Sequence, residues 1–182
     1  LIHDETLKYT GVTWRQCRKL GKQIHSKIIY DINRTEDNNY PLYGIFSDGS
    51  YAMCNQNTVY NVNSAGDGAT TYGIYMNFSW DQAAQLSNNI VMGTTNSGTG
   101  STVLDIKASA GSSSLFKTNM SSDAGSSVGA DGLTSKSAAN QFVSTVNDSQ
   151  DFHLLRTSDA VGDGTDLGVG YHDGYGTGMH NY

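Results

Sequence analysis

The stretch TTYGIYMNF, from Thr70 to Phe78, repeats a phrase that the chain has already used in PLYGIFSDG, from Pro41 to Gly49. Each phrase carries a glycine followed by an isoleucine, and two further pairs of a small and a β-branched residue align with them. The four pairs are Gly11-Val12, Gly44-Ile45, Gly73-Ile74 and Asp105-Ile106, at successive spacings of 33, 29 and 32 residues. A period of about 30 residues is typical of a chain built from stacked structural units.

A second phrase keeps step with the first. It recurs as KIIYDIN (Lys27 to Asn33), NTVYNVN (Asn57 to Asn63) and NIVMGTT (Asn89 to Thr95), at spacings of 30 and 32 residues. Polar stretches of slightly varying length, rich in turn-forming residues, separate the phrases. Two or three short strands per unit, with length changes confined to the turns, predict a coil of parallel strands with about four to five turns.

Equivalent residues of neighbouring turns are expected to lie about 4.8 Å apart, so the alignment predicts columns of side chains. Two aliphatic columns are expected to point inward, because β-branched side chains fill a pleated wall well. They contain Val12, Ile45, Ile74 and Ile106 in one case, and Ile29, Val59 and Val91 in the other. Two further predicted stacks contain Tyr43 with Tyr72, and Tyr30 with Tyr60 and Met92.

Three predicted columns are polar. Asn33 with Asn63, and Asp31 with Asn61, fall at bends, where their side chains can hydrogen-bond along the coil axis. The third column contains Arg15, Asp48, Asn77 and Ser109. The segment from Asp81 to Gly93 contains good helix formers, but it is too short for a stable helix and is predicted as a strand with a loop.

The amino-acid composition agrees with a β-rich chain, and the charge pattern excludes some classes of partner. The 182 residues include 21 Gly, 11 Tyr and 1 Pro, only 15% are charged, and the formal net charge is −6. A basic cluster, from Trp14 to Lys22, is interpreted as a solvated surface, so nucleic acid is not an expected partner. No stretch is apolar enough to predict membrane insertion. Cys17 and Cys54 can be read as a disulfide pair or as buried free thiols, and the sequence leaves both open.

The chain divides into three predicted regions. Residues 1–110 form the repeating coils, residues 111–168 form the last coil or coils with a long loop excursion and closing strands, and residues 169–182 form a glycine-rich tail. The chain begins at Leu1 without a methionine or a leader, so it is interpreted as a fragment or a processed product.

The C-terminal region resembles the closing segment of the right-handed parallel β-helix (pectate-lyase-like) repeat family. That segment commonly contains an F-V strand, a D-F/Y-H-L strand and an S-x-A-[IV]-x-x-G-x-D-x-G ending. The matching residues here are Phe142-Val143, Asp151-Phe152-His153-Leu154, Ser158, Ala160-Val161, Gly164, Asp166 and Gly168. One departure is Asp159, where family members usually carry proline. Together with the repeat, the resemblance implies an all-β fold, a single-stranded right-handed parallel β-helix (solenoid) with an irregular C-terminal closure.

The family contains polysaccharide lyases and hydrolases, bacterial surface proteins and phage virion proteins, so the fold alone does not choose a function. A lyase needs a basic residue beside a calcium site made of acids on successive turns, and a hydrolase needs converging carboxylates. The predicted columns supply neither arrangement. The sequence therefore favours a protein without catalytic residues and without a cofactor.

The acids of DAVGDGTD, Asp159, Asp163 and Asp166, are weak candidates for a calcium site. Because the stretch lacks the alternating oxygen ligands and the distal glutamate of a calcium loop, Asp-Gly turns explain it better. Two histidines and an aspartate, which can together hold a metal ion, follow in the tail: His172, Asp173 and His180. In so glycine-rich a segment they are interpreted as surface residues.

Aromatic residues near the repeated Gly-Ile phrase are the candidate ligand-binding surface. Trp14, Tyr75, Phe78 and Trp80 are candidate glycan-facing residues, since outward aromatic rings stack on sugars. Packing of these rings beneath a loop is an equally weighted alternative.

We expect a non-catalytic structural module of a virion surface or appendage, or of a cell-surface assembly, that recognises glycans. Its expected partners are other copies or neighbouring chains of that assembly, because an open coil end exposes unpaired strand edges. The alternative hypothesis is a fragment of a secreted polysaccharide lyase or glycoside hydrolase.

Overall fold

The computed structural model describes residues 7–10, 23–36, 39–48, 52–77, 84–109 and 115–167. The fold is all-β, as the sequence predicts, and most of the strands lie in parallel sheets. Within these ranges the one helical element is a short 3₁₀ turn, η1 (Ala138–Asn140). No helix in the described part of the chain is long and apolar enough to cross a membrane.

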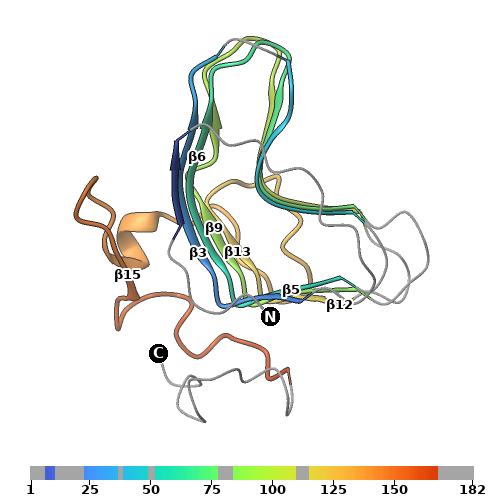
Figure 1. The fold of residues 1–182 in the computed structure, drawn as a ribbon. Helices are drawn as coiled ribbons and strands as arrows, with labels where there is room; N and C mark the ends of the chain where they lie inside the picture. The colour runs from blue at the N-terminus through green and yellow to red at the C-terminus, as the bar shows by residue number, and fades with distance from the viewer. Residues whose placement is uncertain are drawn as a thin grey trace.

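Three parallel sheets, called A, B and C here, form the body of the molecule (Figure 1). Sheet A contains β1 (Leu7–Thr10), β3 (Ile28–Arg34), β6 (Thr58–Ser64), β9 (Ile90–Met92) and β13 (Met120–Ser121), with β10 (Thr95–Asn96) also paired to β6. Sheet B contains β2 (Gln23–His25), β5 (Met53–Asn55), β8 (Gln85–Ser87) and β12 (Leu115–Lys117). Sheet C contains β4 (Leu42–Asp48), β7 (Thr70–Asn77) and β11 (Thr102–Ser109).

Apart from the pairing of β1 with β3, neighbouring strands of each sheet are one sequence unit apart. In sheet C, for example, Ile45 pairs with Ile74 and Ile74 with Ile106. In Figure 1 the successive units overlie one another, so that the three sheets appear as three walls around a common interior. The apolar core lies between these walls and draws residues from all three, such as Leu86, Val59 and Ile74.

The described parts of the aliphatic columns have the predicted register. Ile45, Ile74 and Ile106 are buried at one position of sheet C. Ile29, Val59 and Val91 follow one another in sheet A, where Val59 and Val91 are fully buried and Ile29 packs against the same core.

The polar and aromatic columns are also in register. Tyr43 pairs with Tyr72, Tyr30 pairs with Tyr60, and Tyr60 pairs with Met92. The Nδ2 of Asn63 donates to Oδ1 of Asn33 at 2.8 Å, and the Nδ2 of Asn61 donates to Oδ1 of Asp31 at 2.5 Å. Asp48 pairs with Asn77, and Asn77 with Ser109, while Arg15 lies outside the described residues.

The predicted alignment of the pair Gly11-Val12 and the residues before it, from Lys8, with Pro41 to Ile45 is wrong in the part that the structure describes. The residues of β1 pair with β3 in sheet A, where Leu7 faces Ile29 and Lys8 faces Tyr30, and not with sheet C. A phrase of five residues is compatible with either wall, because alternating strands share one pattern and the pairing partner decides between them. Val12 itself lies outside the described residues.

Each described turn from sheet B to sheet A contains a residue with positive φ, and in three of these turns the next residue is a buried asparagine. Ser26, Gln56, Asn88 and Thr118 adopt φ values of 51°, 58°, 58° and 51°. The residues that follow the last three are Asn57, Asn89 and Asn119, all almost completely buried. Their amides form a ladder, since Asn57 donates to Asn89 at 2.9 Å and Asn89 donates to Asn119 at 2.8 Å.

The chain closes the C-terminal end of the stack with its own residues. At Asp105, β11 carries a buried carboxylate where β4 and β7 carry glycine, and residues 122–128 cross beside it. That carboxylate accepts hydrogen bonds from the backbone N–H groups of Thr94, Ser122 and Asp123, at 3.0, 2.7 and 3.2 Å, and from two serine hydroxyls. Val128 packs against the core. The expected open edge is therefore covered at this end without another chain.

The two closing strands do not continue the parallel sheets. β14 (Phe142–Ser144) and β15 (Asp151–Leu154) pair with each other in antiparallel orientation. They were expected among the last turns of the coil, but Phe142 and Phe152 pack with Met92 and Met120 on the outside of sheet A. In Figure 1 this region lies beside sheet A, outside the three walls.

Candidate functional site

An aromatic cluster of Tyr43, Phe46, Tyr72 and Tyr75 lies on sheet C. The ring of Tyr43 stacks on Phe46 with centroids 4.9 Å apart and on Tyr72 at 5.9 Å. Tyr75 lies 5.6 Å from both Tyr43 and Phe46 and 5.2 Å from Tyr72. The cluster therefore spans two adjacent strands and two columns.

Regular alternation alone does not explain this cluster, because Tyr43 and Phe46 are three residues apart and a regular strand would place them on opposite faces. Tyr43 and Tyr72 form one column and Phe46 and Tyr75 the next, while Ile45 and Ile74 between them point into the core. On β11 the two columns continue as Leu104 and Lys107. Aromatic rings thus give way to an aliphatic and a basic side chain at the third strand.

The phenols of Tyr43 and Tyr72 are held in the neutral form, because their surroundings raise the pKa of both. Burial raises the pKa of Tyr43, and the neighbouring phenols of Tyr75 and Tyr72 raise it further. Burial raises the pKa of Tyr72 as well, again with a contribution from Tyr75. Neutral phenols beside flat apolar faces are suited to contact with a polar, uncharged ring, such as a sugar.

Of the four predicted glycan-facing residues, the structure describes one. Tyr75 lies at the centre of the aromatic cluster, in contact with its three other rings. Trp14, Phe78 and Trp80 lie outside the described residues. The sequence predicted that Tyr43 stacks with Tyr72, but it did not predict that either ring contacts Tyr75. It did not single out Phe46.

A groove of about 660 Å³ lies between the outer face of sheet A and residues 150–167, which we call the strap. The strap is fixed at both ends. At its start, Gln150 donates to Oδ2 of Asp31 in sheet A at 2.7 Å, and the Phe152 ring lies 5.3 Å from Tyr30 and 5.5 Å from Tyr60. Near its end, Thr165 is hydrogen-bonded to Asn88, in the turn from sheet B to sheet A.

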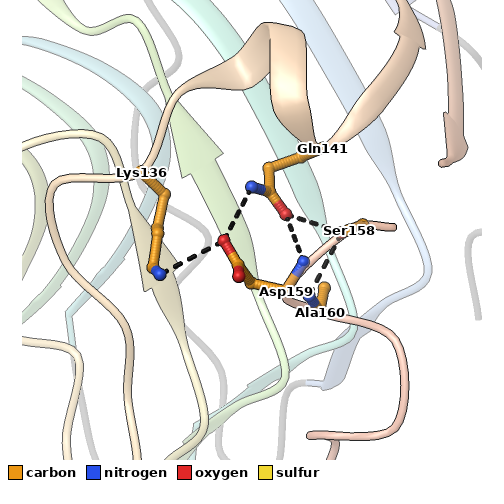
Figure 2. A network of polar contacts seen from close by, with 5 residues as sticks. All are labelled: Lys136, Gln141, Ser158, Asp159 and Ala160. Carbon is orange, nitrogen blue, oxygen red and sulfur yellow. Dashed lines mark hydrogen bonds and ion pairs between the residues drawn. The ribbon is translucent and has the colours of Figure 1, made fainter. Parts of the chain in front are cut away.

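Asp159, one of the weak calcium candidates, takes part in an internal polar network (Figure 2). Its Oδ2 forms an ion pair with Lys136 at 3.1 Å and accepts a hydrogen bond from Nε2 of buried Gln141 at 3.1 Å. Lys136 first, and then Gln141, lower the pKa of Asp159 below its usual range. The Oε1 of Gln141 accepts from the hydroxyl of Ser158 at 2.6 Å and from the backbone N–H of Asp159 at 3.0 Å.

These contacts assign Asp159 to the attachment of the strap. Asp163 lines the groove, and Asp166 lies one residue beyond Thr165. The described ranges contain no group of three or more histidine, cysteine or acidic residues placed to hold a metal ion. His172, Asp173 and His180 lie outside these ranges.

Asp151 and His153 form a pair at the edge of the groove. The His153 Nδ1 lies 2.6 Å from Oδ1 of Asp151, which also accepts from the His153 backbone N–H at 3.0 Å. The backbone contact and then the side-chain contact lower the pKa of Asp151. Since 89% of the His153 side chain is exposed, this pair lacks the burial that tunes acid and base groups in catalytic sites.

Cys54 is a free, fully buried thiol in the core of sheet B, so the free-thiol alternative applies to it. Burial raises its pKa to about 12, although a hydrogen bond with Asn57 opposes the shift. A protonated, enclosed thiol is a packing group and a poor nucleophile. Cys17 lies outside the described residues.

Several residues that position these sites were not predicted. They are Asn57, Asn89, Asn119, Asp105, Asn88 and Gln141. A signal for the asparagine ladder was present, because Asn57 and Asn89 are the first residues of two copies of the second phrase, 32 residues apart, and Asn119 follows 30 residues later. Gln141 and Asn88 had no such signal, since their partners lie 18 and 77 residues away.

Comparisons of the chain with protein-family models, with curated proteins and with solved structures found no match.

Proposed function

We propose that the chain is a right-handed parallel β-helix and acts as a rigid, non-catalytic structural module of a virion surface or appendage, or of a cell-surface assembly. Parallel sheets whose strands lie one unit apart support the coil, and two continuous ladders of side chains support its rigidity. Asparagines that hydrogen-bond to their counterparts in the next unit oppose local opening.

We further propose that this module recognises neutral glycans through the aromatic cluster on sheet C. The observation that carries this proposal is the close set of four rings, Tyr43, Phe46, Tyr72 and Tyr75, on sheet C, of which Tyr72 is the one buried member. Stacking on sugar rings is a recognised use of such faces, and the neutral phenols can hydrogen-bond to sugar hydroxyls.

Glycan-array binding followed by calorimetric titration tests the glycan part. We expect Tyr75→Ala to weaken binding of the best array ligand about tenfold, because truncating a central aromatic contact typically has an effect of this size. Tyr40→Ala is the matched control, since Tyr40 is 69% exposed and outside the cluster. Equal binding by wild type and Tyr75→Ala would contradict the assignment of this surface.

The non-catalytic part has a separate test. Incubation with pectic, alginate and neutral polysaccharides should release neither new reducing ends nor unsaturated products. Cleavage of any of them would support the alternative, a fragment of a secreted polysaccharide lyase or glycoside hydrolase.

A further inference from the structure

The strap shows how the outer edge of sheet A binds a polypeptide. The Nδ2 of Asn88 donates to the carbonyl oxygen of Thr165 at 2.8 Å, and the Thr165 N–H donates to Oδ1 of Asn88 at 2.9 Å. One side-chain amide therefore pairs with both main-chain groups of Thr165, much as a neighbouring strand would. The Thr118 hydroxyl completes the contact by donating to Asn88 at 2.5 Å, and it lies 3.0 Å from the Thr165 hydroxyl.

Asn88 belongs to a column of four residues, and the strap hydrogen-bonds to two of them. Ser26, Gln56, Asn88 and Thr118 occupy the same turn in successive units, and all four line the groove. Thr165 engages the last two members of this column. Gln56, one unit before Asn88, carries the same amide group.

Gln56 has an unused acceptor. Within the described part of the chain, its Oε1 is buried and has no hydrogen-bond partner. A buried acceptor without a donor is destabilising and calls for an explanation such as a ligand that supplies the donor. Its place beside Asn88 makes a main-chain N–H the fitting donor.

The charge of the groove restricts the ligand. Asp131, Asp151 and Asp163 line it, against one lysine, Lys27. A surplus of carboxylates disfavours acidic ligands and favours neutral or basic ones. A sugar is the weaker candidate here, because the aromatic rings in the groove, Tyr30 and Phe152, already pack on each other at 5.3 Å.

We propose that the groove between sheet A and the strap binds an extended polypeptide segment of neutral or basic character, and that Gln56 hydrogen-bonds to its main chain as Asn88 does to Thr165. The site is distinct from the aromatic cluster, which lies on sheet C. A neighbouring chain of an assembly is a partner of this kind.

The probe is a fluorescein-labelled peptide, GNGTNL, which is the strap sequence Gly162 to Leu167 with its two aspartates replaced by asparagine to remove the negative charge. Fluorescence anisotropy should show saturable binding to the full chain. A second peptide with an N-methylated threonine lacks the proposed main-chain donor, and a third, GDGTDL, retains the negative charge. Both should bind more weakly than GNGTNL.

Gln56→Ala should weaken binding of GNGTNL about five- to tenfold, the range expected for one lost hydrogen bond. It should not weaken binding of the N-methylated peptide further, because that peptide cannot use Oε1. Asn140→Ala, at an exposed position outside the groove, should leave binding unchanged. Thermal unfolding by circular dichroism verifies that Gln56→Ala is folded, and removal of an unsatisfied acceptor should not lower its midpoint.

Three results would overturn the proposal: no saturable binding of GNGTNL, binding that Gln56→Ala leaves unchanged, or an N-methylated peptide that binds as well as the parent. Displacement of the peptide by cellohexaose or chitohexaose, with loss of sugar binding in Gln56→Ala, would assign the groove to glycans instead.

Discussion

Gly73 lies where sheet C packs against sheet A without room for a side chain. A Cβ at this position would be 2.2 Å from Cγ1 of Val91 and 2.8 Å from the carbonyl oxygen of Asp105. Gly44 has the same role one unit earlier, where a Cβ would be 2.8 Å from Cγ1 of Val59. The glycine of the repeated phrase is thus required by the contact between two walls, and each glycine faces a member of the other aliphatic column.

Gly73→Ala should therefore lower the free energy of unfolding by about 1–3 kcal/mol, the usual cost of overfilling a well-packed interior. Denaturant unfolding followed by circular dichroism measures the change. The control is Gly164→Ala, because a Cβ there would first meet Asn88 at 3.8 Å. A Gly73→Ala variant as stable as this control would show that the walls can separate at little cost.

The asparagine ladder gives a second prediction at this scale. Asn89 accepts from both the backbone N–H and Nδ2 of Asn57, at 3.0 and 2.9 Å, and donates to Asn119. Asn89→Ala removes the side-chain acceptor of the buried Asn57 backbone N–H and the side-chain donor to Asn119 and to the carbonyl oxygen of Cys54, so we expect a loss of about 2–4 kcal/mol. Denaturant unfolding measures this loss, and Asn140→Ala, at an exposed asparagine, should change stability by less than about 0.5 kcal/mol.

At the scale of elements, one of the carboxylates that attach the strap has a lowered pKa. This carboxylate, Asp159, is paired with Lys136 and hydrogen-bonded to Gln141, which lowers its pKa in the folded protein. A lowered pKa means that the stabilising contribution is present in full above the ordinary value of 3.8 and is lost as the pH falls through the folded value.

Acidification below about pH 4 should therefore loosen residues 158–160 before the sheets unfold. Backbone amide signals of these residues in heteronuclear NMR spectra, recorded from pH 6 to pH 2, measure the effect. In Asp159→Asn, which cannot titrate here, the same signals should move much less. Identical titration curves in the two proteins would assign the transition to another acid.

The repeated phrases predicted the long strands and missed the short strands of sheet B. β3, β4, β6, β7 and β11 have seven or eight residues each, with a pattern that recurs at a fixed spacing. The strands of sheet B have three residues each, too few to show a period. Their positions depend on the turns with positive φ that follow them, where serine, glutamine, asparagine and threonine take the place of the expected glycine.

The candidate sites were less predictable than the strands because they depend on contacts between distant segments. The aromatic cluster combines two columns, and only one of them, Tyr43 with Tyr72, was in the alignment. The groove requires the strap to fold back on sheet A, which the contact of Gln150 with Asp31, 119 residues apart, illustrates. No local pattern encodes a contact at that separation.

For the whole molecule, the sequence predicted that the ends of the coil expose unpaired strand edges, and the structure differs at one end. The C-terminal end is covered by residues 122–128, with Ser127 donating to the carbonyl oxygen of Ile106 at 2.9 Å. Strand edges attract other chains when they are unpaired, so this end is a poor site for stacking of a second copy.

The core should unfold as one unit when its centre is disrupted. Ile74 is fully buried between Ile45 and Ile106, so it contacts the units on both sides. In a stacked repeat, stability depends on contacts between neighbouring units, and a defect in the middle removes two of them. Ile74→Asp places an uncompensated charge there, and we expect a loss of about 3–5 kcal/mol or complete unfolding.

Circular dichroism and size-exclusion chromatography of Ile74→Asp measure this effect. Thr102→Asp is the matched control, because Thr102 is an exposed residue of β11 in the same sheet and should accept the charge with little change. If Ile74→Asp retained a cooperative transition near that of the wild type, the units would have to be stable without their central contact, and the continuous core could not be the main source of stability.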